Sequence, residues 1–362
     1  MDLSNLNKKF FKYIIIAVVA VVVLLLIMWL ISLSNNKKLD FTEIEDKMIE
    51  AAQDYMEEND TKLPIEGNEM VLSISTLVEN GNMKDLSKYT DDDVTCTGEV
   101  VVKNNSGFYS YIPFLNCGKT YKTQSLSDYI TNHEEIVSQD AGLYSVGNEY
   151  IYRGEFVNNF VSFAGKLWRI IKIDGDGDIK LLQYESKDRS VWDDRYNVVK
   201  EQTVGINEYN ISRLHESLTD IYDEKFEDEE KAKIVSKDLC IGERFEQDTT
   251  KDGSTECAKK LPNQKVGVIQ ANEYLYASID PNCVNTYSDA CQNYNYLALF
   301  DRSLWTITPL AENNYEAYYI SQTYLDSAKA YNEKYIYLTL YLDKNTLYSS
   351  GTGTEEDPYI IK

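Results

Sequence analysis

The chain has 362 residues, with 36 lysines and arginines against 59 aspartates and glutamates, and its formal net charge is −23 at pH 7. Phosphate contacts need clustered Lys and Arg, so this balance argues against a nucleic acid partner. The length that remains after an N-terminal apolar stretch predicts about two domains.

The first element along the chain is an apolar stretch from Tyr13 to Ile31 that carries no charged side chain. At about 1.5 Å per residue it spans roughly 28 Å, close to the hydrocarbon thickness of a bilayer. Ser32 and Ser34 leave signal cleavage open, but a secretory signal has a shorter apolar core. We therefore expect residues 13–32 to form a retained transmembrane helix that anchors the protein in the cell membrane.

The orientation of this anchor follows from charge and from cysteine positions. Three lysines precede the stretch and two follow it, so the positive-inside rule favours a cytoplasmic tail at residues 1–12. All six cysteines follow the stretch, and an even number of cysteines in an exported segment predicts disulfides. The sequence thus predicts a single-pass protein with an extracellular C-terminal ectodomain.

A small domain is expected over residues 40–122, and it begins with a helix. Asp40 is a good N-cap and Glu43 stands three residues later, as in a capping box. A short helix over Ser75–Glu79 comes next, and then two strand-like runs around a turn. If Ser106 and Gly107 are the central turn residues, Cys96 and Cys117 face each other across the hairpin, although alternation alone allows other registers.

Residues 123–149 are expected to be a connector with a short helix, and residues 150–362 a β-rich domain with a few helices. The runs FAGKLWRIIKID and DIKLLQYE flank a glycine turn and predict a hairpin. Ile211, Leu214 and Leu218 share one face of an amphipathic helix. The predicted fold class is therefore α+β.

The four remaining cysteines are expected to pair locally. Six cysteines allow fifteen pairings, and we choose Cys240–Cys257 and Cys283–Cys291, beside Cys96–Cys117, because each pair encloses one turn-rich segment. Each cysteine then has a partner nearby, which predicts structural bridges and not reactive thiols.

The region from Tyr152 to Lys362 resembles a family of uncharacterised surface domains of exported bacterial proteins. The resemblance rests on YRGEFVNNFVSFAGKLWRIIKID, on LWTITPL with its W-x-x-x-P pattern, on EAYYIS and on the closing GTGTEEDPY. The family implies no activity. It is distantly similar to the C-type-lectin-like fold shared with formylglycine-generating enzymes, and fold similarity does not assign function.

Two candidate sites stand out in the second domain. Asp174, Asp176 and Asp178 form D-G-D-G-D, like the start of a calcium loop, but the sixth position is Ile179 and the expected flanks are strands. We therefore interpret this segment as a plain turn and expect no metal site and no cofactor. The second candidate is aromatic: Trp305, Tyr315, Tyr318 and Tyr319 could line a ligand-binding surface, with core packing as the alternative.

These features predict a non-catalytic binding or adhesion protein of the cell surface, with a glycan or a protein as ligand. The sequence shows no nucleophile elbow, metalloprotease helix or phosphate loop. An enzyme on a fold like that of the formylglycine-generating enzymes is a third hypothesis. The second hypothesis is a structural or assembly component of an envelope apparatus, pilin-like in organisation only, because the small domain has a helix followed by a hairpin. FTEIE at 41–45 also resembles the FTLIE signature of type IV prepilins. That signature precedes the apolar segment in prepilins and follows it here, so the match is interpreted as coincidence.

Overall fold

The computed structural model describes residues 38–105, 107–299, 302–321 and 324–362, together with Val19 and Val21–Val23. Apart from these four valines, the predicted membrane span at residues 13–32 lies outside the described residues. Within the described ranges, none of the helices combines the length and the apolarity needed to cross a bilayer.

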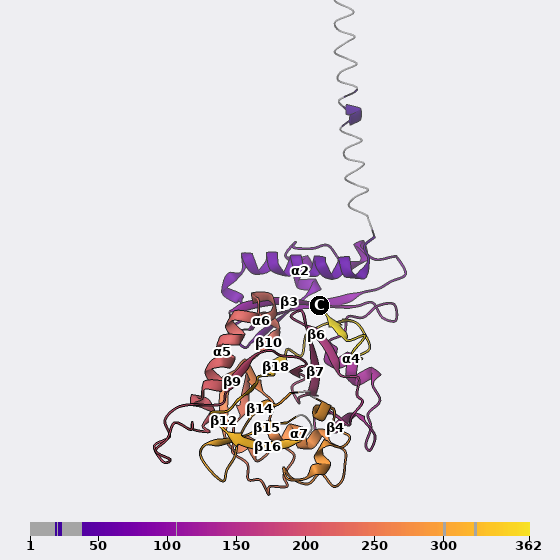
Figure 1. The fold of residues 1–362 in the computed structure, drawn as a ribbon. Helices are drawn as coiled ribbons and strands as arrows, with labels where there is room; N and C mark the ends of the chain where they lie inside the picture. The colour runs from indigo at the N-terminus through magenta and orange to yellow at the C-terminus, as the bar shows by residue number, and fades with distance from the viewer. Residues whose placement is uncertain (1–18, 20, 24–37, 106, 300–301, 322–323) are drawn as a thin grey trace, which may run out of the picture. The chain divides into compact units, whose positions relative to one another are not determined.

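The chain folds into two compact units, and its fold is α+β and rich in strands, as predicted (Figure 1). The first unit comprises Met1–Lys62, Val71–Val100 and Pro113–Lys122, and the second comprises Leu63–Met70, Val101–Ile112 and Thr123–Lys362. The first two helices and the three-stranded sheet β1-β2-β3 come early in the chain, with bounds α2 Phe41–Glu58, η1 Asp60–Lys62, β1 Glu69–Ser73, α3 Ile74–Glu79, η2 Leu86–Lys88, β2 Thr97–Asn105 and β3 Phe108–Asn116.

Helix α2 starts and packs as its sequence predicts. The side chain of Asp40 accepts the amide N–H of Glu43 at 2.7 Å, and the side chain of Glu43 accepts that of Asp40 at 3.1 Å. These two bonds satisfy backbone donors that a helix end leaves without partners. Its apolar stripe is buried, with Ile44, Met48 and Ala52 fully covered. The stripe therefore stabilises this unit.

The main segment of the second unit, Thr123–Lys362, contains four further α-helices and seventeen strands in its described part. The helical segments are α4 Leu126–His133, η3 Tyr209–Ile211, α5 Arg213–Lys225, α6 Asp228–Lys233, η4 Glu256–Ala258, α7 Ala271–Ala277, η5 Asp289–Gln292 and η6 Tyr296–Leu299. The strands are β4 Gly142–Val146, β5 Glu149–Arg153, β6 Phe160–Phe163, β7 Lys166–Ile173, β8 Ile179–Gln183, β9 Arg189–Val191, β10 Ile234–Val235, β11 Lys237–Cys240, β12 Lys260–Gln264, β13 Val266–Val268, β14 Leu304–Pro309, β15 Glu316–Ile320, β16 Leu325–Lys329, β17 Glu333–Tyr335, β18 Leu338–Leu342, β19 Tyr348–Ser350 and β20 Tyr359–Ile361.

A ten-stranded sheet forms the centre of this unit, in the order β10-β18-β8-β7-β6-β20-β19 with β4, β5 and β13 paired off this path. Strands β7 and β8 form the predicted hairpin, in which Ile173 faces Ile179. Residues 123–149 are not a separate connector: they contain α4, and β4 joins the sheet through β5. The last strand, β20, pairs in parallel with β6.

A five-stranded sheet, in the order β16-β15-β14-β17-β9, completes the unit together with the small pair β11-β12. Three tryptophans fill the core: Trp168, Trp192 and Trp305 have no exposed surface. Their indole N–H groups each donate to a backbone carbonyl, of Phe163, Thr306 and Ser190 respectively. A buried indole needs such a partner, so all three are fixed in position as well as covered.

Candidate functional site

The four aromatic residues around Trp305 that the sequence suggested as a ligand-binding surface do not form a common surface. Trp305 and Tyr318 lie on β14 and β15 and are 0% and 1% exposed, so core packing is the correct interpretation for both. Tyr315 and Tyr319 are only partly buried. A lysine covers each ring, with Lys200 Nζ 4.5 Å from the centre of Tyr315 and Lys334 Nζ 3.4 Å from the centre of Tyr319. The prediction of Trp305 and Tyr318 as ligand contacts was wrong because β14 is buried along its whole length and Tyr318 lies in the buried part of its neighbour β15.

The predicted disulfides are confirmed, and they form the three local pairs. Cys96 bonds to Cys117, Cys240 to Cys257 and Cys283 to Cys291. No described cysteine is free. The Cys240–Cys257 and Cys283–Cys291 bonds fix two adjoining loops of the second unit.

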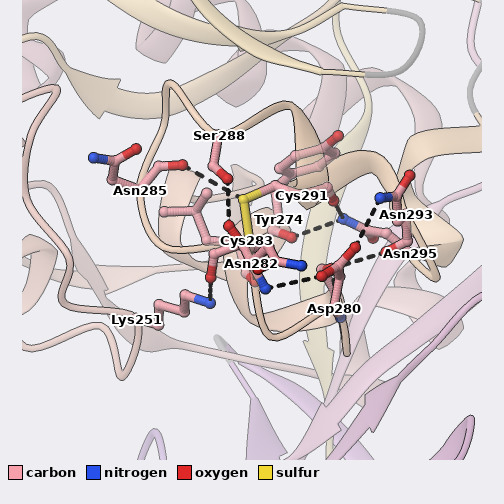
Figure 2. Close-up of a disulfide and its surroundings, with 12 residues drawn as sticks. Lys251, Tyr274, Asp280, Asn282, Cys283, Asn285, Ser288, Cys291, Asn293 and Asn295 are labelled. Atoms are coloured by element: carbon pink, nitrogen blue, oxygen red, sulfur yellow. Dashed lines mark hydrogen bonds between the residues drawn. A yellow bond between two sulfur atoms is a disulfide. The ribbon is translucent and has the colours of Figure 1, made fainter.

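The loops that carry Cys257 and Cys283 are also joined to each other by hydrogen bonds. Lys251 donates from Nζ to the carbonyl of Cys283 (Figure 2). Thr286 donates from Oγ1 to the carbonyl of Glu246 at 2.8 Å. The rings of Phe245 and Tyr287, which neighbour the second bond in sequence, are 59% and 61% exposed. The hydrogen-bonded pair of loops therefore leaves these two aromatic rings exposed to solvent, outside the lining of the cleft described below.

Amide side chains brace the Cys283–Cys291 loop from within. Asn295 donates from Nδ2 to the carbonyls of Tyr274 and Cys291 at 2.9 and 2.7 Å. Asn293 donates to the carboxylate of Asp280 at 2.7 Å. These contacts tie the loop to helix α7, so the disulfide closes a segment that is already ordered.

Removing this disulfide gives a testable change in stability. A variant with both Cys283→Ser and Cys291→Ser should lose about 2–3 kcal/mol of unfolding free energy, because a bridge around a loop this short restricts the unfolded chain by roughly that amount. Urea unfolding of the full chain, followed by tryptophan fluorescence, measures it. An unchanged midpoint would contradict the prediction and would show that the amide contacts alone hold the loop.

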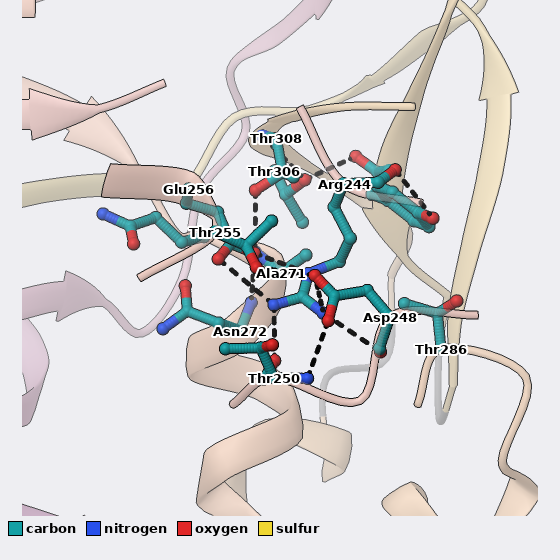
Figure 3. A network of polar contacts seen from close by, with 12 residues as sticks. Arg244, Asp248, Thr250, Thr255, Glu256, Ala271, Asn272, Thr286, Thr306 and Thr308 are labelled. Carbon is teal, nitrogen blue, oxygen red and sulfur yellow. Dashed lines mark hydrogen bonds and ion pairs between the residues drawn. The ribbon is translucent and has the colours of Figure 1, made fainter. Parts of the chain in front are cut away.

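A buried ion pair organises the loop between Cys240 and Cys257. Arg244 and Glu256 are both 0% exposed, and Arg244 Nε lies 2.7 Å from Glu256 Oε1 (Figure 3). The guanidinium also donates to the carbonyl of Thr250 at 2.6 Å and to that of Asp248 at 3.2 Å. In addition, Glu256 accepts the amide N–H of Asn272 at 3.2 Å. Buried charges are tolerated when paired and hydrogen-bonded in this way.

A cleft of about 600 Å³ lies between the large sheet and these loops. Strands β5, β7, β11 and β18, the β7–β8 turn and helix α7 each contribute to its wall. The Cys240–Cys257 bond is part of its lining. The charged, amide and tyrosine side chains of its lining include Glu149, Tyr152, Lys172, Asp174, Asp176, Lys237, Lys251, Asn272, Glu273, Tyr276, Tyr296 and Tyr341.

The charged groups of the cleft are largely neutralised within the protein. Lys172 pairs with Glu149 at 2.9 Å. Glu273 pairs with the buried Lys180 at 2.5 Å, and burial lowers the pKa of that lysine despite its partner. The two glutamates of the described lining are therefore held as counter-ions. A ligand entering the cleft would meet ion pairs and not isolated charges.

Neutral polar groups without partners also line the cleft. Asn272 Oδ1 and the hydroxyl of Tyr296 are buried and have no hydrogen-bond partner in the described part of the chain. The side chain of Asn272 extends away from Arg244 (Figure 3). Burial raises the pKa of Tyr296 and that of Tyr341, so both hydroxyls stay protonated at neutral pH. Buried polar atoms that stay unpaired cost free energy, and a bound polar ligand would satisfy them.

The three aspartates of D-G-D-G-D lie together in the turn between β7 and β8, and Asp174 and Asp176 are part of the cleft lining. The turn is a hairpin connection, as interpreted from the sequence. Sequence reasoning did not find their partner: the ammonium of Lys237, on β11, contacts all three carboxylates. It also did not find the Arg244–Glu256 pair, because charged residues far apart in a polar loop give no periodic signal.

No family model, curated protein or solved structure matches the chain. The resemblance to exported bacterial surface domains therefore stays a prediction, and so does the C-type-lectin-like likeness.

Proposed function

We propose that this protein is a non-catalytic surface recognition protein, and that the cleft of its second unit binds a glycan. The observation that carries the proposal is the cleft itself. It combines tyrosine rings, unpaired neutral polar atoms and internally paired charges, and bridged loops fix its rim. Ligand sites typically join apolar or aromatic walls to a few such polar groups.

A polyhydroxylated ligand suits this chemistry better than a strongly charged one. Each sugar hydroxyl both donates and accepts, so it can meet the acceptor of Asn272 and the hydroxyl of Tyr296. Tyr276 and Tyr341, which are partly exposed, offer rings for the apolar side of a sugar ring. The described lining carries six acidic side chains and four lysines, a modest excess beside the −23 of the whole chain. This near balance favours a ligand without a large net charge.

Binding is favoured over turnover by the state of the carboxylates. General acid and base catalysis requires a group free to exchange a proton with the substrate. Glu149 and Glu273 are instead engaged with lysines, and Cys240 and Cys257, the two cysteines of the lining, are joined in a disulfide. The described lining residues include no histidine. These features support a recognition site.

The setting in this proposal is the outer face of a cell membrane. Disulfides persist in oxidising compartments, and three of them hold the described chain. The apolar stretch at residues 13–32 would supply the anchor. An assembly component would instead need a helix that exposes an apolar stripe to neighbouring subunits. The stripe of α2 is buried within its own unit, so the recognition proposal is preferred.

The test is a glycan array probed with the detergent-solubilised full chain and with two cleft variants. We expect saturable binding to a subset of glycans. Asn272→Ala and Tyr276→Ala should each weaken it about tenfold, because each removes one polar or stacking contact worth roughly 1.4 kcal/mol. Tyr287→Ala, on the exposed loop outside the cleft lining, serves as the matched control and should bind as the wild type does. Glycan binding that survives both cleft substitutions, or no binding to any glycan, would refute the proposal.

A further inference from the structure

A second cavity, of about 820 Å³, lies at the other end of strand β7 from the cleft. Lys166 and Leu167, at the start of β7, line the cavity, whereas Ile171 and Lys172, further along the strand, line the cleft. The loop after β8, the last residue of α5 and part of the C-terminal segment also contribute to the cavity wall. The two described linings share no residue, so the cavity is a separate space.

Two ammonium groups of the cavity lie near one carboxylate. Lys225 Nζ donates to both carboxylate oxygens of Asp188, at 2.6 and 2.5 Å, so Asp188 already has its counter-ion. Among the described residues, no carboxylate forms an ion pair with Lys166. Burial lowers the pKa of Lys166, and the positive charge of Lys225 lowers it further. An anion in the cavity would therefore supply the counter-ion that Lys166 lacks.

The cavity also contains a buried acceptor that receives no hydrogen bond. Gln183, at the end of β8, is 2% exposed and belongs to the lining. Its Nε2 donates to the carbonyl of Glu185 at 2.6 Å, which fixes the orientation of the amide. Its Oε1 is buried and has no partner within the described ranges of the chain. An unpaired buried acceptor costs free energy, so a ligand that donates a hydrogen bond here is favoured.

Lys166 and Gln183 lie close together on one face of the sheet. Trp168 faces Gln183 across the antiparallel β7–β8 pair, and Lys166 is two residues before Trp168, on the same side of its strand. Such diagonal neighbours are about 7–8 Å apart. The amide N–H of Tyr184 donates to the carbonyl of Leu167 at 3.0 Å, which extends this pairing past Gln183. One small ligand can therefore reach both groups.

We infer that this cavity is a second ligand site, separate from the cleft, and that it binds a hydroxylated carboxylate, the chemistry of a sugar acid. The carboxylate pairs with Lys166, and a hydroxyl group donates to Gln183 Oε1. The described lining has four basic and three acidic side chains, so it suits a single negative charge better than a dianion such as phosphate. The inference does not rest on glycan binding in the cleft.

Saturation-transfer NMR of the detergent-solubilised full chain, with D-glucuronate as the probe, tests this inference. We expect saturable binding in the millimolar range. Lys166→Ala should weaken it about tenfold, because the carboxylate loses its charged partner, and Lys166→Arg should retain most of the affinity. Gln183→Met keeps the length of the side chain but removes the amide, and it should weaken binding about fivefold.

Lys172→Ala is the matched control, since Lys172 lies on the same strand but lines the cleft and pairs with Glu149. It should bind glucuronate as the wild type does, and so should the cleft variant Asn272→Ala. No glucuronate binding, or equal affinity in Lys166→Ala and the wild type, would overturn the inference. Loss of binding in Asn272→Ala but not in Lys166→Ala would place the acid in the cleft and would also overturn it. Failure of the glycan proposal would leave these outcomes unchanged, because the two sets of variants lie in different linings.

Discussion

Replacing Arg244 with methionine should lower the unfolding free energy of the second unit by about 3–5 kcal/mol, because it leaves the carboxylate of Glu256 buried without its partner. Both side chains are 0% exposed, and the guanidinium also holds the carbonyls of Asp248 and Thr250. The loop between Cys240 and Cys257 would lose the ion pair and the hydrogen bonds that hold it. Urea unfolding followed by tryptophan fluorescence measures the change.

Arg189→Met is the control for this prediction. Arg189 pairs with Glu333 at 3.2 Å, but the two side chains are 47% and 54% exposed, so the pair should contribute less than about 1 kcal/mol. The double variant Arg244→Met with Glu256→Met should recover much of the loss, since it removes both buried charges. If Arg244→Met costs no more than Arg189→Met, the buried pair does not organise the loop.

Trp305→Ala should cost about 3–5 kcal/mol of stability, the usual range for deleting a buried tryptophan. The ring has no exposed surface, and its N–H donates to the Ser190 carbonyl at 3.1 Å, so the change opens a cavity and leaves that acceptor unpaired. Thermal and urea unfolding of the full chain both report the loss.

Phe245→Ala provides the comparison, because that ring is 59% exposed and its removal should change stability by less than about 0.5 kcal/mol. A Trp305→Ala variant that melts like the wild type would contradict the burial described here and return this residue to the recognition surface.

Local features of the fold could be predicted from the sequence because local interactions determine them. The capping box at Asp40, the β7–β8 hairpin around its glycine turn and the three short-range disulfides all depend on residues close in the chain. In each case one kind of local contact determines the structure: a helix cap, a turn or a disulfide bridge. The α+β class followed from the same signals.

Long-range features could not be predicted in this way. The sequence around β4 predicts only a connector, because nothing local shows that this strand pairs with β5 and so joins the central sheet. The burial of Trp305 depends on β9 and β17 packing around β14, which alternation alone does not reveal. Lys237 meets the aspartate turn only through the path of β11, and the chain between them carries no pattern that links the two.

The pairing of β20 with β6 also bears on the order in which the molecule can form. Val161 lies beside Tyr359 in a parallel ladder, so most of the second unit lies between the two partners in sequence. Contacts between such distant segments form slowly, because a long loop must close before any pairing is gained. A chain emerging from its N-terminal end would hold β6 with one edge open until Tyr359 arrives. We therefore expect the nascent protein to need protection of that edge, and its rate of maturation to be set by the last strand.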